Sequence, residues 1–177
     1  MTHDNIIIRR ETPADYVEVY ILVKSAFATT PDSDGDEQDY LNELRQKDTF
    51  IPELSLLAES KDGKIIGQIV LYQTDITTPQ GKLTELVLSP ISVHPDYFRR
   101  GVARRMIDRA LGIAKEMGYK AVFLCGEPGI YSWLGFSPSR HYGIYHVKDD
   151  SKTADWSMVR ELYDGALNGV MGTVDML

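Results

Sequence analysis

The chain has 177 residues, of which 43% are hydrophobic and 25% charged, a composition typical of a folded globular protein rather than a disordered one. Its formal net charge of −7 argues against broad nucleic-acid binding, and no apolar run approaches membrane-spanning length. The N-terminus has no basic segment followed by a long apolar core, so no secretory signal is expected, and Cys125 is the sole cysteine, which excludes an internal disulfide. We therefore expect one cytoplasmic domain over residues 1–177.

The first part of the chain predicts a strand followed by two helices. Ile6–Arg10 is apolar and extended in character, and Thr12 is a suitable N-cap with Pro13 at the first helical position. The predicted inward face of the first helix consists of Tyr16, Tyr20, Val23 and Phe27. A polar loop over 29–37 leads to a second helix over 36–46. Its predicted inward residues are Tyr40, Leu41 and Leu44.

The middle of the chain predicts a meander of three strands. Leu54–Glu59 and Ile65–Tyr72 are joined by the turn 61–64, where an Asp-Gly pair between apolar runs favours a hairpin. A second turn leads to the strand Leu83–Val93. Because Pro90 cannot donate a hydrogen bond, we expect the strand pairing to be interrupted or bulged there.

The remaining elements indicate a strand–helix–strand crossover followed by a tail. An amphipathic helix over Ala103–Met117 precedes the strand Ala121–Cys125, which predicts a right-handed crossover with parallel pairing. A short helix is expected over Ile130–Leu134. The segment Asp155–Leu162 fits either helix or strand, and Val170–Met176 reads as a closing strand. The predicted fold class is α/β, with a mixed, twisted sheet and helices on both faces.

The junction between strand Leu83–Val93 and the following helix, residues 94–101, is named here the basic loop. Gly101 permits an unusual φ and close approach of a ligand to the backbone, and Ala103 leaves room at the helix start. Four arginines add positive charge: Arg99, Arg100, Arg104 and Arg105. Backbone N–H groups at a helix start are suited to an anion such as a pyrophosphate. The alternative is a tight turn beside a solvated basic helix face, and the spacing alone leaves both open.

Two sequence motifs resemble the signatures of the GNAT superfamily of acetyl-CoA-dependent N-acetyltransferases. Val93-His-Pro-Asp-Tyr-Phe-Arg-Arg-Gly-Val-Ala103 resembles V-x-P-x-Y-[QR]-x-x-G-x-[GA], except that Phe98 stands where the family usually has Gln or Arg. That departure removes a side chain near the pyrophosphate but no backbone amide. Downstream, Ile130-Tyr-Ser-Trp-Leu-Gly-Phe136 resembles F-Y-x-x-x-G-F. The segments 126–132 and 165–172 look closest to the YhbS-like bacterial branch of the family.

The resemblance implies a mostly antiparallel GNAT-like sheet and acetyl-CoA as cosubstrate. The implied cofactor-binding residues are Ile91, Ser92, Val93, Phe98, Arg99, Arg100, Gly101, Val102, Ala103, Arg104 and Tyr131. Backbone groups near 91–93, freed by the interruption at Pro90, would bond the pantetheine. An N–H group there would also polarise the thioester carbonyl.

The resemblance also suggests two catalytic residues, each with a plainer alternative. Tyr131 would protonate the leaving thiolate, although an aromatic residue there could equally pack a short helix against the sheet. Glu85 would be the general base, directly or through water, or else a solvent-facing residue of an antiparallel strand. Glu127 is a second candidate carboxylate.

The implied activity is direct transfer of an acetyl group from acetyl-CoA to a primary amine in a ternary complex. A non-catalytic acyl-CoA-binding or sensing module and a nucleotide-binding regulatory domain are the alternatives. The expected partner is a small-molecule or peptide amine; nucleic acid and membranes are not expected, and a homodimer is left open. The four histidines show no metal-ligand spacing, so no metal is expected. Cys125 ends an apolar strand and is expected to be a buried structural thiol rather than a nucleophile.

Overall fold

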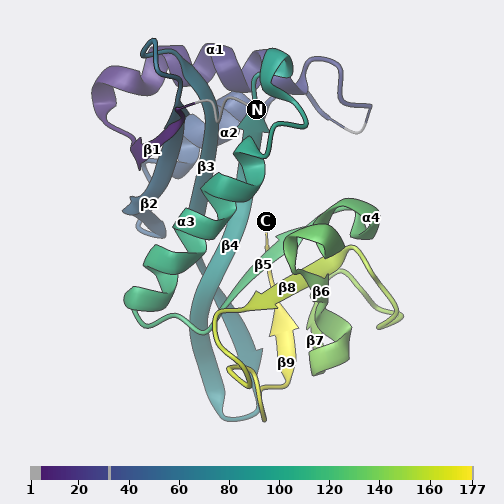
Figure 1. The fold of residues 1–177 in the computed structure, drawn as a ribbon. Coiled ribbons are helices and arrows are strands. Elements are labelled where there is room, and N and C mark those ends of the chain that lie inside the picture. Colours follow the sequence, from purple (N-terminus) through teal and green to yellow (C-terminus); the bar gives the residue numbers. More distant parts are fainter. Residues whose placement is uncertain (1–4, 32, 177) are drawn as a thin grey trace. The chain divides into compact units, whose positions relative to one another are not determined.

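The computed structural model describes residues 5–31 and 33–176, which form two compact units (Figure 1). Unit 1 comprises the chain up to residue 71 together with 89–113, and unit 2 comprises 72–88 together with residues from 114 onward. Two long strands, β3 (Ile65–Thr78) and β4 (Gly81–Val93), contribute residues to both units. The assignment of 1–177 to one domain stays a prediction.

In unit 1, the strands are hydrogen-bonded neighbours in the order β1-β2-β3-β4, with β1 (Ile7–Arg10) antiparallel to β2 (Phe50–Glu59). The predicted hairpin between β2 and β3 is present. The Ser60 N–H donates to the Lys64 carbonyl at 2.9 Å, and Gly63 has a φ of 80°, which this tight turn requires.

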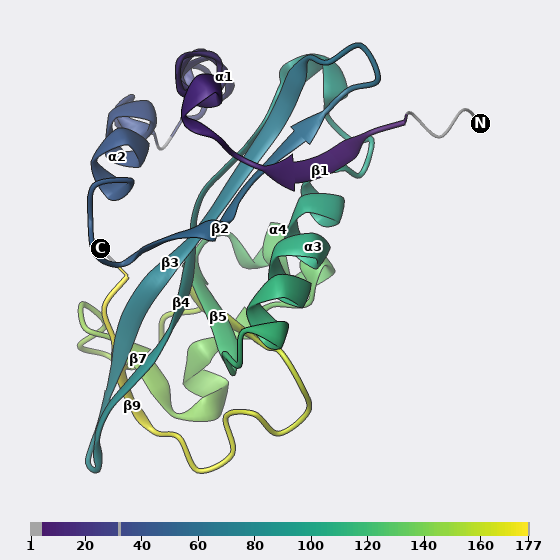
Figure 2. The same cartoon turned by 90° about the vertical axis from the view of Figure 1, so that its left-hand side faces the viewer.

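Three helices cover the two faces of the unit 1 strands. Figure 2 shows α1 (Tyr16–Phe27) and α2 (Glu37–Leu44) on one face and α3 (Val102–Glu116) on the other, which confirms the expectation of helices on both faces. Helix α3 approaches β3 closely, because a Cβ atom on Gly67 would lie only 2.9 Å from Cε of Met106. Gly67 therefore faces α3.

The inward faces of α1 and α2 agree with the prediction in part: Val23, Leu41 and Leu44 are buried as predicted. The buried residues of α1 are Val19, Leu22 and Val23, and those of α2 are Gln38, Leu41 and Leu44. Tyr16, Tyr20, Phe27 and Tyr40 are only partly buried. For the tyrosines, the reason is that the ring packs against neighbours while the hydroxyl reaches a polar partner, and Phe27 is the last residue of α1. The Tyr20 hydroxyl, for example, donates to Asp39 of α2 at 2.9 Å.

Unit 2 contains the remaining strands and one short helix. Their bounds are β5 (Ala121–Cys125), α4 (Pro128–Tyr131), β6 (Ser137–Pro138), β7 (Ile144–His146), β8 (Ser157–Glu161) and β9 (Gly172–Val174). Short 3-10 turns occupy Pro13–Asp15, Pro95–Tyr97, Ser132–Leu134 and Ser139–Tyr142 of the chain. Strands β4, β5, β8 and β6 are successive neighbours, while β9 pairs with β3 and with β7.

The parallel pairing of β4 with β5 confirms the pairing predicted for the crossover. Leu86 pairs with Val122, and Val87 pairs with Phe123, whose side chain is fully buried. The ambiguous segment Asp155–Leu162 forms the strand β8, antiparallel to β5. The sheet is therefore mixed and mostly antiparallel, as expected for this fold class.

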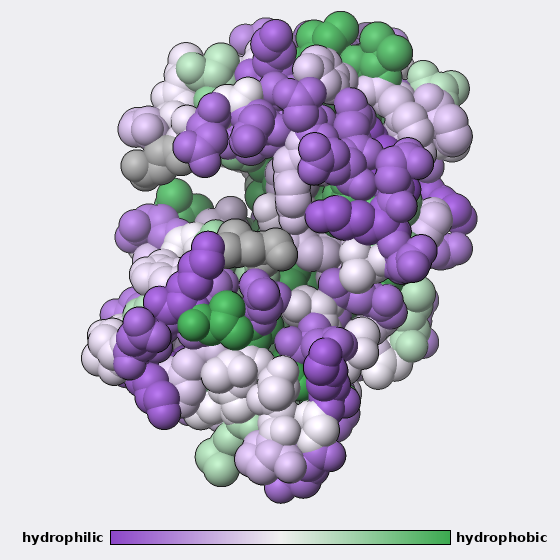
Figure 3. Space-filling model, turned by 180° about the vertical axis from the view of Figure 1, so that it is seen from behind, coloured by the Kyte–Doolittle hydropathy of each residue, from purple (hydrophilic) through white to green (hydrophobic). Residues whose placement is uncertain are grey.

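The surface seen from behind is mainly hydrophilic or neutral, with hydrophobic areas that are small and separate (Figure 3). Exposed large hydrophobic residues belong to several different elements, including Val17, Ile21, Phe98, Trp133 and Met171. Among the helices of the described residues, none combines the length and apolar character needed to span a membrane.

A charged cluster fixes the entry into α1. The backbone N–H and the hydroxyl of Thr12 both donate to the Asp15 carboxylate, at 2.8 and 3.0 Å. The Arg9 guanidinium donates two further bonds to Asp15, at 2.9 and 2.8 Å, and one to Glu59 of β2. The Arg9 bonds hold the pKa of Asp15 well below its usual range, because they stabilise the charged carboxylate.

We predict that Asp15→Asn lowers the free energy of unfolding by roughly 1–3 kcal/mol at neutral pH, because the amide keeps the shape but loses the charge. A depressed carboxyl pKa contributes stability above the unfolded-state pKa of about 3.9 and loses it as the pH falls. Chemical denaturation from pH 7 to pH 3 should therefore show the difference from the parent chain narrowing below about pH 4. Asp48→Asn, at an exposed position, is the control. A difference that stays constant over the whole range would contradict this role.

Candidate functional site

Strand β4 changes its environment at Pro90. Before it, Leu86 and Val87 pair in parallel with β5 in unit 2. From Ser89 onward the strand belongs to unit 1, and the Ser89–Pro90 peptide bond is cis. Pro90 thus lies beside the boundary between the two units, and the expected interruption of pairing there stays a prediction.

The end of β4 has one edge bonded to β3 and one edge directed away from it. The His94 N–H donates to the Ile66 carbonyl of β3 at 2.7 Å. Successive strand residues direct their backbone groups to alternate edges, so the backbone groups of Ser92 also point to β3. Those of Ile91 and Val93 consequently point to the opposite edge, which is where the pantetheine was expected.

The basic loop converts the end of β4 into the start of α3. His94 caps the 3-10 turn, because its Nδ1 accepts a bond from the backbone N–H two residues ahead at 3.2 Å. Arg99 and Gly101 both have positive φ, 59° and 77°, which turns the chain into the helix. The Arg105 N–H donates to the Gly101 carbonyl, so the N–H groups of Val102–Arg104 precede the first helical hydrogen bond. This is the geometry of an anion site at a helix N-terminus.

The arginines near the basic loop do not all serve the same purpose. Arg105 donates to the Ile6 carbonyl at 2.7 Å and thereby ties α3 to the segment before β1. This contact replaces the role near a phosphate that the sequence predicted for Arg105. The Arg100 guanidinium lies 5.2 Å from the centre of the Tyr97 ring. Phe98, at the position that departs from the family signature, is 54% exposed.

Glu85 is buried, which contradicts the solvent-facing alternative. It is 2% exposed, and its Oε2 accepts bonds from the backbone N–H groups of Lys120 and Ala121 at 2.8 and 3.1 Å. Burial raises the pKa of Glu85, while these two bonds lower it. The carboxylate thus anchors the start of β5 from within β4. Its role as general base stays a prediction.

Tyr131 ends helix α4 in unit 2. Its ring packs edge-on to Phe136 with 6.1 Å between the ring centres, and a Cβ atom on Gly126 would lie 2.5 Å from its Cε2. Among the described residues, none bonds to the Tyr131 hydroxyl. Burial raises the pKa of Tyr131, so the hydroxyl is protonated at neutral pH. Glu127 caps the same helix by accepting a bond from the Gly129 N–H at 3.3 Å.

Two further groups of unit 2 bear on the chemistry. Cys125 is exposed, contrary to expectation, since it is the last residue of β5. Partial burial nevertheless raises the pKa of its thiol to about 11, so it is a poor nucleophile at neutral pH.

His146, which the sequence did not single out, is buried, with Nδ1 accepting from the Lys148 N–H and Nε2 unpaired. Desolvation lowers the pKa of His146, so it is neutral. In the described part of the chain, no three metal-ligating side chains come together.

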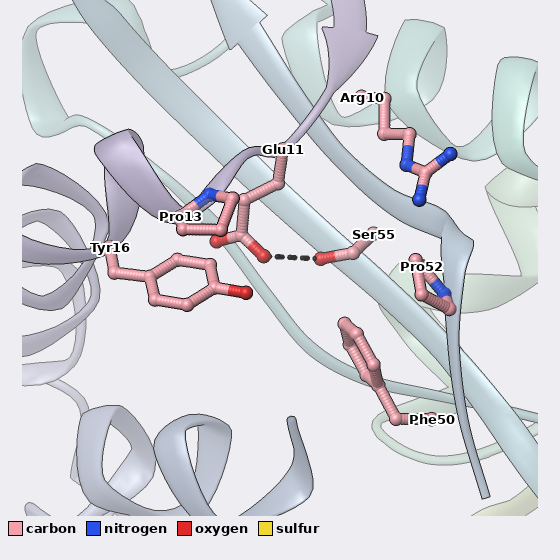
Figure 4. Close-up of a pocket in the computed structure, with 7 residues that line it drawn as sticks. All are labelled: Arg10, Glu11, Pro13, Tyr16, Phe50, Pro52 and Ser55. Carbon is pink, nitrogen blue, oxygen red and sulfur yellow. Dashed lines mark hydrogen bonds between the residues drawn. The ribbon is translucent and has the colours of Figure 1, made fainter. Parts of the chain in front are cut away.

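A hollow of about 210 Å³ lies at the start of α1 (Figure 4). It is lined by Arg10, Glu11, Pro13, Tyr16, Phe50, Pro52 and Ser55. Glu11 pairs with Arg45, and both side chains are almost fully buried. The Ser55 hydroxyl donates to the same carboxylate at 2.8 Å. Because both carboxylate oxygens are occupied, this hollow is held together by an internal network and offers no uncompensated charge to a ligand.

The predicted site residues fall into two groups. The residues from the end of β4 to the first turn of α3 form one continuous segment of unit 1. Glu85 and Tyr131 belong to unit 2, on different elements. Their assignment as catalytic residues stays a prediction.

Residues 7–139 match the family model described as an acetyltransferase (GNAT) domain. The chain is 32% identical over 171 residues to the uncharacterised N-acetyltransferase YhbS of Escherichia coli K12, covering 96% of this chain and 95% of that protein. The crystal structure of E. coli YhbS in complex with CoA is similar, with a TM-score of 0.84 and 29% identity over 98% of this chain and 91% of that one. A Brucella melitensis GNAT acetyltransferase crystallised with acetyl-CoA shares the fold, with a TM-score of 0.77 and 23% identity over 99% and 97% of the two chains.

We predict that the two hydrogen bonds accepted by Glu85 stabilise the fold. Glu85→Leu should lower the free energy of unfolding by roughly 2–5 kcal/mol, because two buried N–H groups lose their acceptor. Glu85→Gln keeps an oxygen acceptor and should cost less than half as much. Urea denaturation of both variants measures the difference, and equal stability of the two variants would rule out the anchoring role.

Proposed function

Since the chain belongs to the GNAT acetyltransferase family, we propose that it transfers an acetyl group from acetyl-CoA to a primary amine by direct attack in a ternary complex. One observation carries the proposal. The edge of β4 that points away from β3 leads directly into the basic loop, where Gly101 has a φ of 77° and α3 begins. A helix start of this kind favours a pyrophosphate, and an adjacent strand edge can bond an extended amide-containing chain.

In this proposal the cosubstrate lies along unit 1 from the basic loop to the end of β4. The N–H groups of Gly101–Arg104 bind the pyrophosphate, with charge supplied by Arg99 and Arg100. The backbone groups of Ile91 and Val93 bond the pantetheine, and one N–H group polarises the thioester carbonyl. Because these contacts are made by the backbone, Phe98 does not remove them.

The chemical step needs a proton donor and a proton acceptor. The amine nitrogen attacks the thioester carbon, the C–S bond breaks, and the CoA thiolate leaves. We assign the proton that this thiolate takes up to the Tyr131 hydroxyl, which is protonated at neutral pH and has no partner among the described residues. The proton lost by the amine goes to Glu85, Glu127 or water; burial of Glu85 raises its pKa, which improves it as a base.

The acceptor is proposed to be a small-molecule or peptide amine in the cytoplasm. The alternative function, a non-catalytic acyl-CoA-binding module, is favoured by one observation: Phe98 replaces the usual Gln or Arg of the family motif and is largely exposed. Binding of acetyl-CoA without release of free thiol would identify that alternative.

We predict that acetyl-CoA stabilises the chain by about 2.7 kcal/mol at a hundredfold excess over its dissociation constant, and that ATP does so far less.

Gly101→Val should weaken acetyl-CoA binding much more than it weakens the fold, because a β-branched side chain resists positive φ and obstructs backbone contact. Gly118→Val is the matched control, since Gly118 also has positive φ and open space around it but lies at the other end of α3. Thermal shift and calorimetric titration measure both effects. If the folded Gly101→Val variant binds acetyl-CoA normally, the basic loop is a structural turn and does not bind the pyrophosphate.

We predict that Tyr131→Phe lowers turnover by roughly 10²–10⁴ while acetyl-CoA affinity barely changes, since only the hydroxyl is removed. Release of free CoA thiol with a panel of primary amines is the measurement. Glu85→Gln, measured alongside, should lower turnover only if Glu85 is the base. Full turnover by Tyr131→Phe would assign protonation to water or another donor.

A further inference from the structure

Unit 1 contains two strand residues whose buried polar atoms have no hydrogen-bond partner. Nε2 of Gln68 on β3 and Oγ of Ser92 on β4 are both enclosed and unpaired, and the two residues are only 2% and 5% exposed. An unpaired buried polar atom costs roughly 1–3 kcal/mol, so native proteins seldom retain one without a reason. Because the two unpaired atoms lie on neighbouring strands, we consider one cause for both.

The strand register places these two residues opposite each other. The His94 N–H bonds to the Ile66 carbonyl, and counting back along β4 while counting forward along β3 pairs Ser92 with Gln68. Side chains of directly opposed residues in an antiparallel pair lie on the same face of the sheet, and their two Cβ atoms are typically about 4.5–5.5 Å apart. Gln68 and Ser92 are therefore neighbours on one face of the sheet, named here the polar pair, and neither unpaired atom is bonded to the other residue.

This pair lies on the face of unit 1 that carries α1 and α2. Gly67 faces Met106 of α3, and alternate residues of a strand point to opposite faces, so Gln68 points away from α3. Figure 2 shows α1 and α2 on that other side. The Glu18 side chain of α1 accepts a bond from the Ile65 N–H, which confirms that α1 packs against this part of β3.

Ser92 also lies between Ile91 and Val93, the residues assigned to the thioester end of the cosubstrate. Their backbone groups occupy the strand edge, while the side chains of Ser92 and Gln68 rise from the face beside it. A group held by this pair is therefore next to the reacting carbonyl but on the opposite side of the sheet from α3. Resting on the proposed function, we infer that Gln68 and Ser92 hold the acyl acceptor and select an amine with an uncharged hydrogen-bonding group near its nitrogen.

The chemistry of the pair sets the acceptor class. The carboxamide of Gln68 offers N–H donors, and the Ser92 hydroxyl can donate or accept. Neither side chain carries charge, so a carbonyl or hydroxyl group suits them better than a carboxylate, which arginine binds more strongly. Because water scarcely reaches these atoms, an acceptor lacking such a group leaves them unpaired, and that penalty is the source of selectivity.

The test compares three primary amines of similar size at saturating acetyl-CoA: glycinamide, ethanolamine and propylamine. The measured quantity is a ratio: kcat/KM for glycinamide, or for ethanolamine, divided by kcat/KM for propylamine. We expect this ratio to fall about tenfold in Gln68→Met and by a smaller factor in Ser92→Ala. Dividing the variant ratio by the parent ratio cancels the intrinsic reactivity of each amine. Acetyl-CoA affinity should stay within about twofold of the parent value.

Gln46→Met makes the same chemical change at an exposed position after α2 and should leave all ratios unchanged. Unchanged ratios in both Gln68→Met and Ser92→Ala would mean that the pair holds an internal water, and the inference would be wrong. A chain that binds acetyl-CoA but acetylates neither glycinamide nor ethanolamine would also overturn it. Failure to bind acetyl-CoA at all would instead overturn the proposed function.

Discussion

Strand β4 lies between β3 and β5, and the candidate site depends on the backbone edge that the end of β4, beyond Pro90, directs away from β3. Leu86 and Val87 are paired with β5, whereas the His94 N–H is bonded to β3. A strand paired on both edges throughout would offer a ligand no backbone groups. Proline suits the point of change because it has no N–H to leave unpaired. The residues beyond it reach the basic loop with one edge directed away from β3.

Several arginine side chains of this acidic chain bond to the protein itself. Arg9 joins the start of α1 to β2, Arg45 pairs with the buried Glu11, and Arg105 ties α3 to the segment before β1. Arg9 and Arg45 each donate from several guanidinium nitrogens, a fork of N–H donors that lysine lacks. The positive charge left for a phosphate is therefore smaller than the arginine count suggests, and the backbone amides at the start of α3 gain importance.

Local signals predicted the local parts of the structure. The Asp-Gly turn specified the hairpin because a hairpin depends on neighbouring residues. The parallel pairing of β4 with β5 joins distant residues, but the order strand, helix, strand predicted it through the general rule for such crossovers. The burial of Glu85 could not be predicted, since it results from amide groups 35 and 36 residues away. The same holds for the unpaired atoms of Gln68 and Ser92, which require knowledge of the register. The inward face of α1 was misassigned because Tyr20 reaches Asp39 on another helix.

The missing side chain of Gly126 has a consequence for how this protein can change over generations. Its backbone lies so close to the Tyr131 ring that even a methyl group would collide with it. A rigid ring cannot yield as a flexible side chain does, so the two positions are not independent. A larger residue at 126 requires the aromatic ring at 131 to move or to be replaced by a smaller side chain. Substitutions at these two positions are therefore coupled.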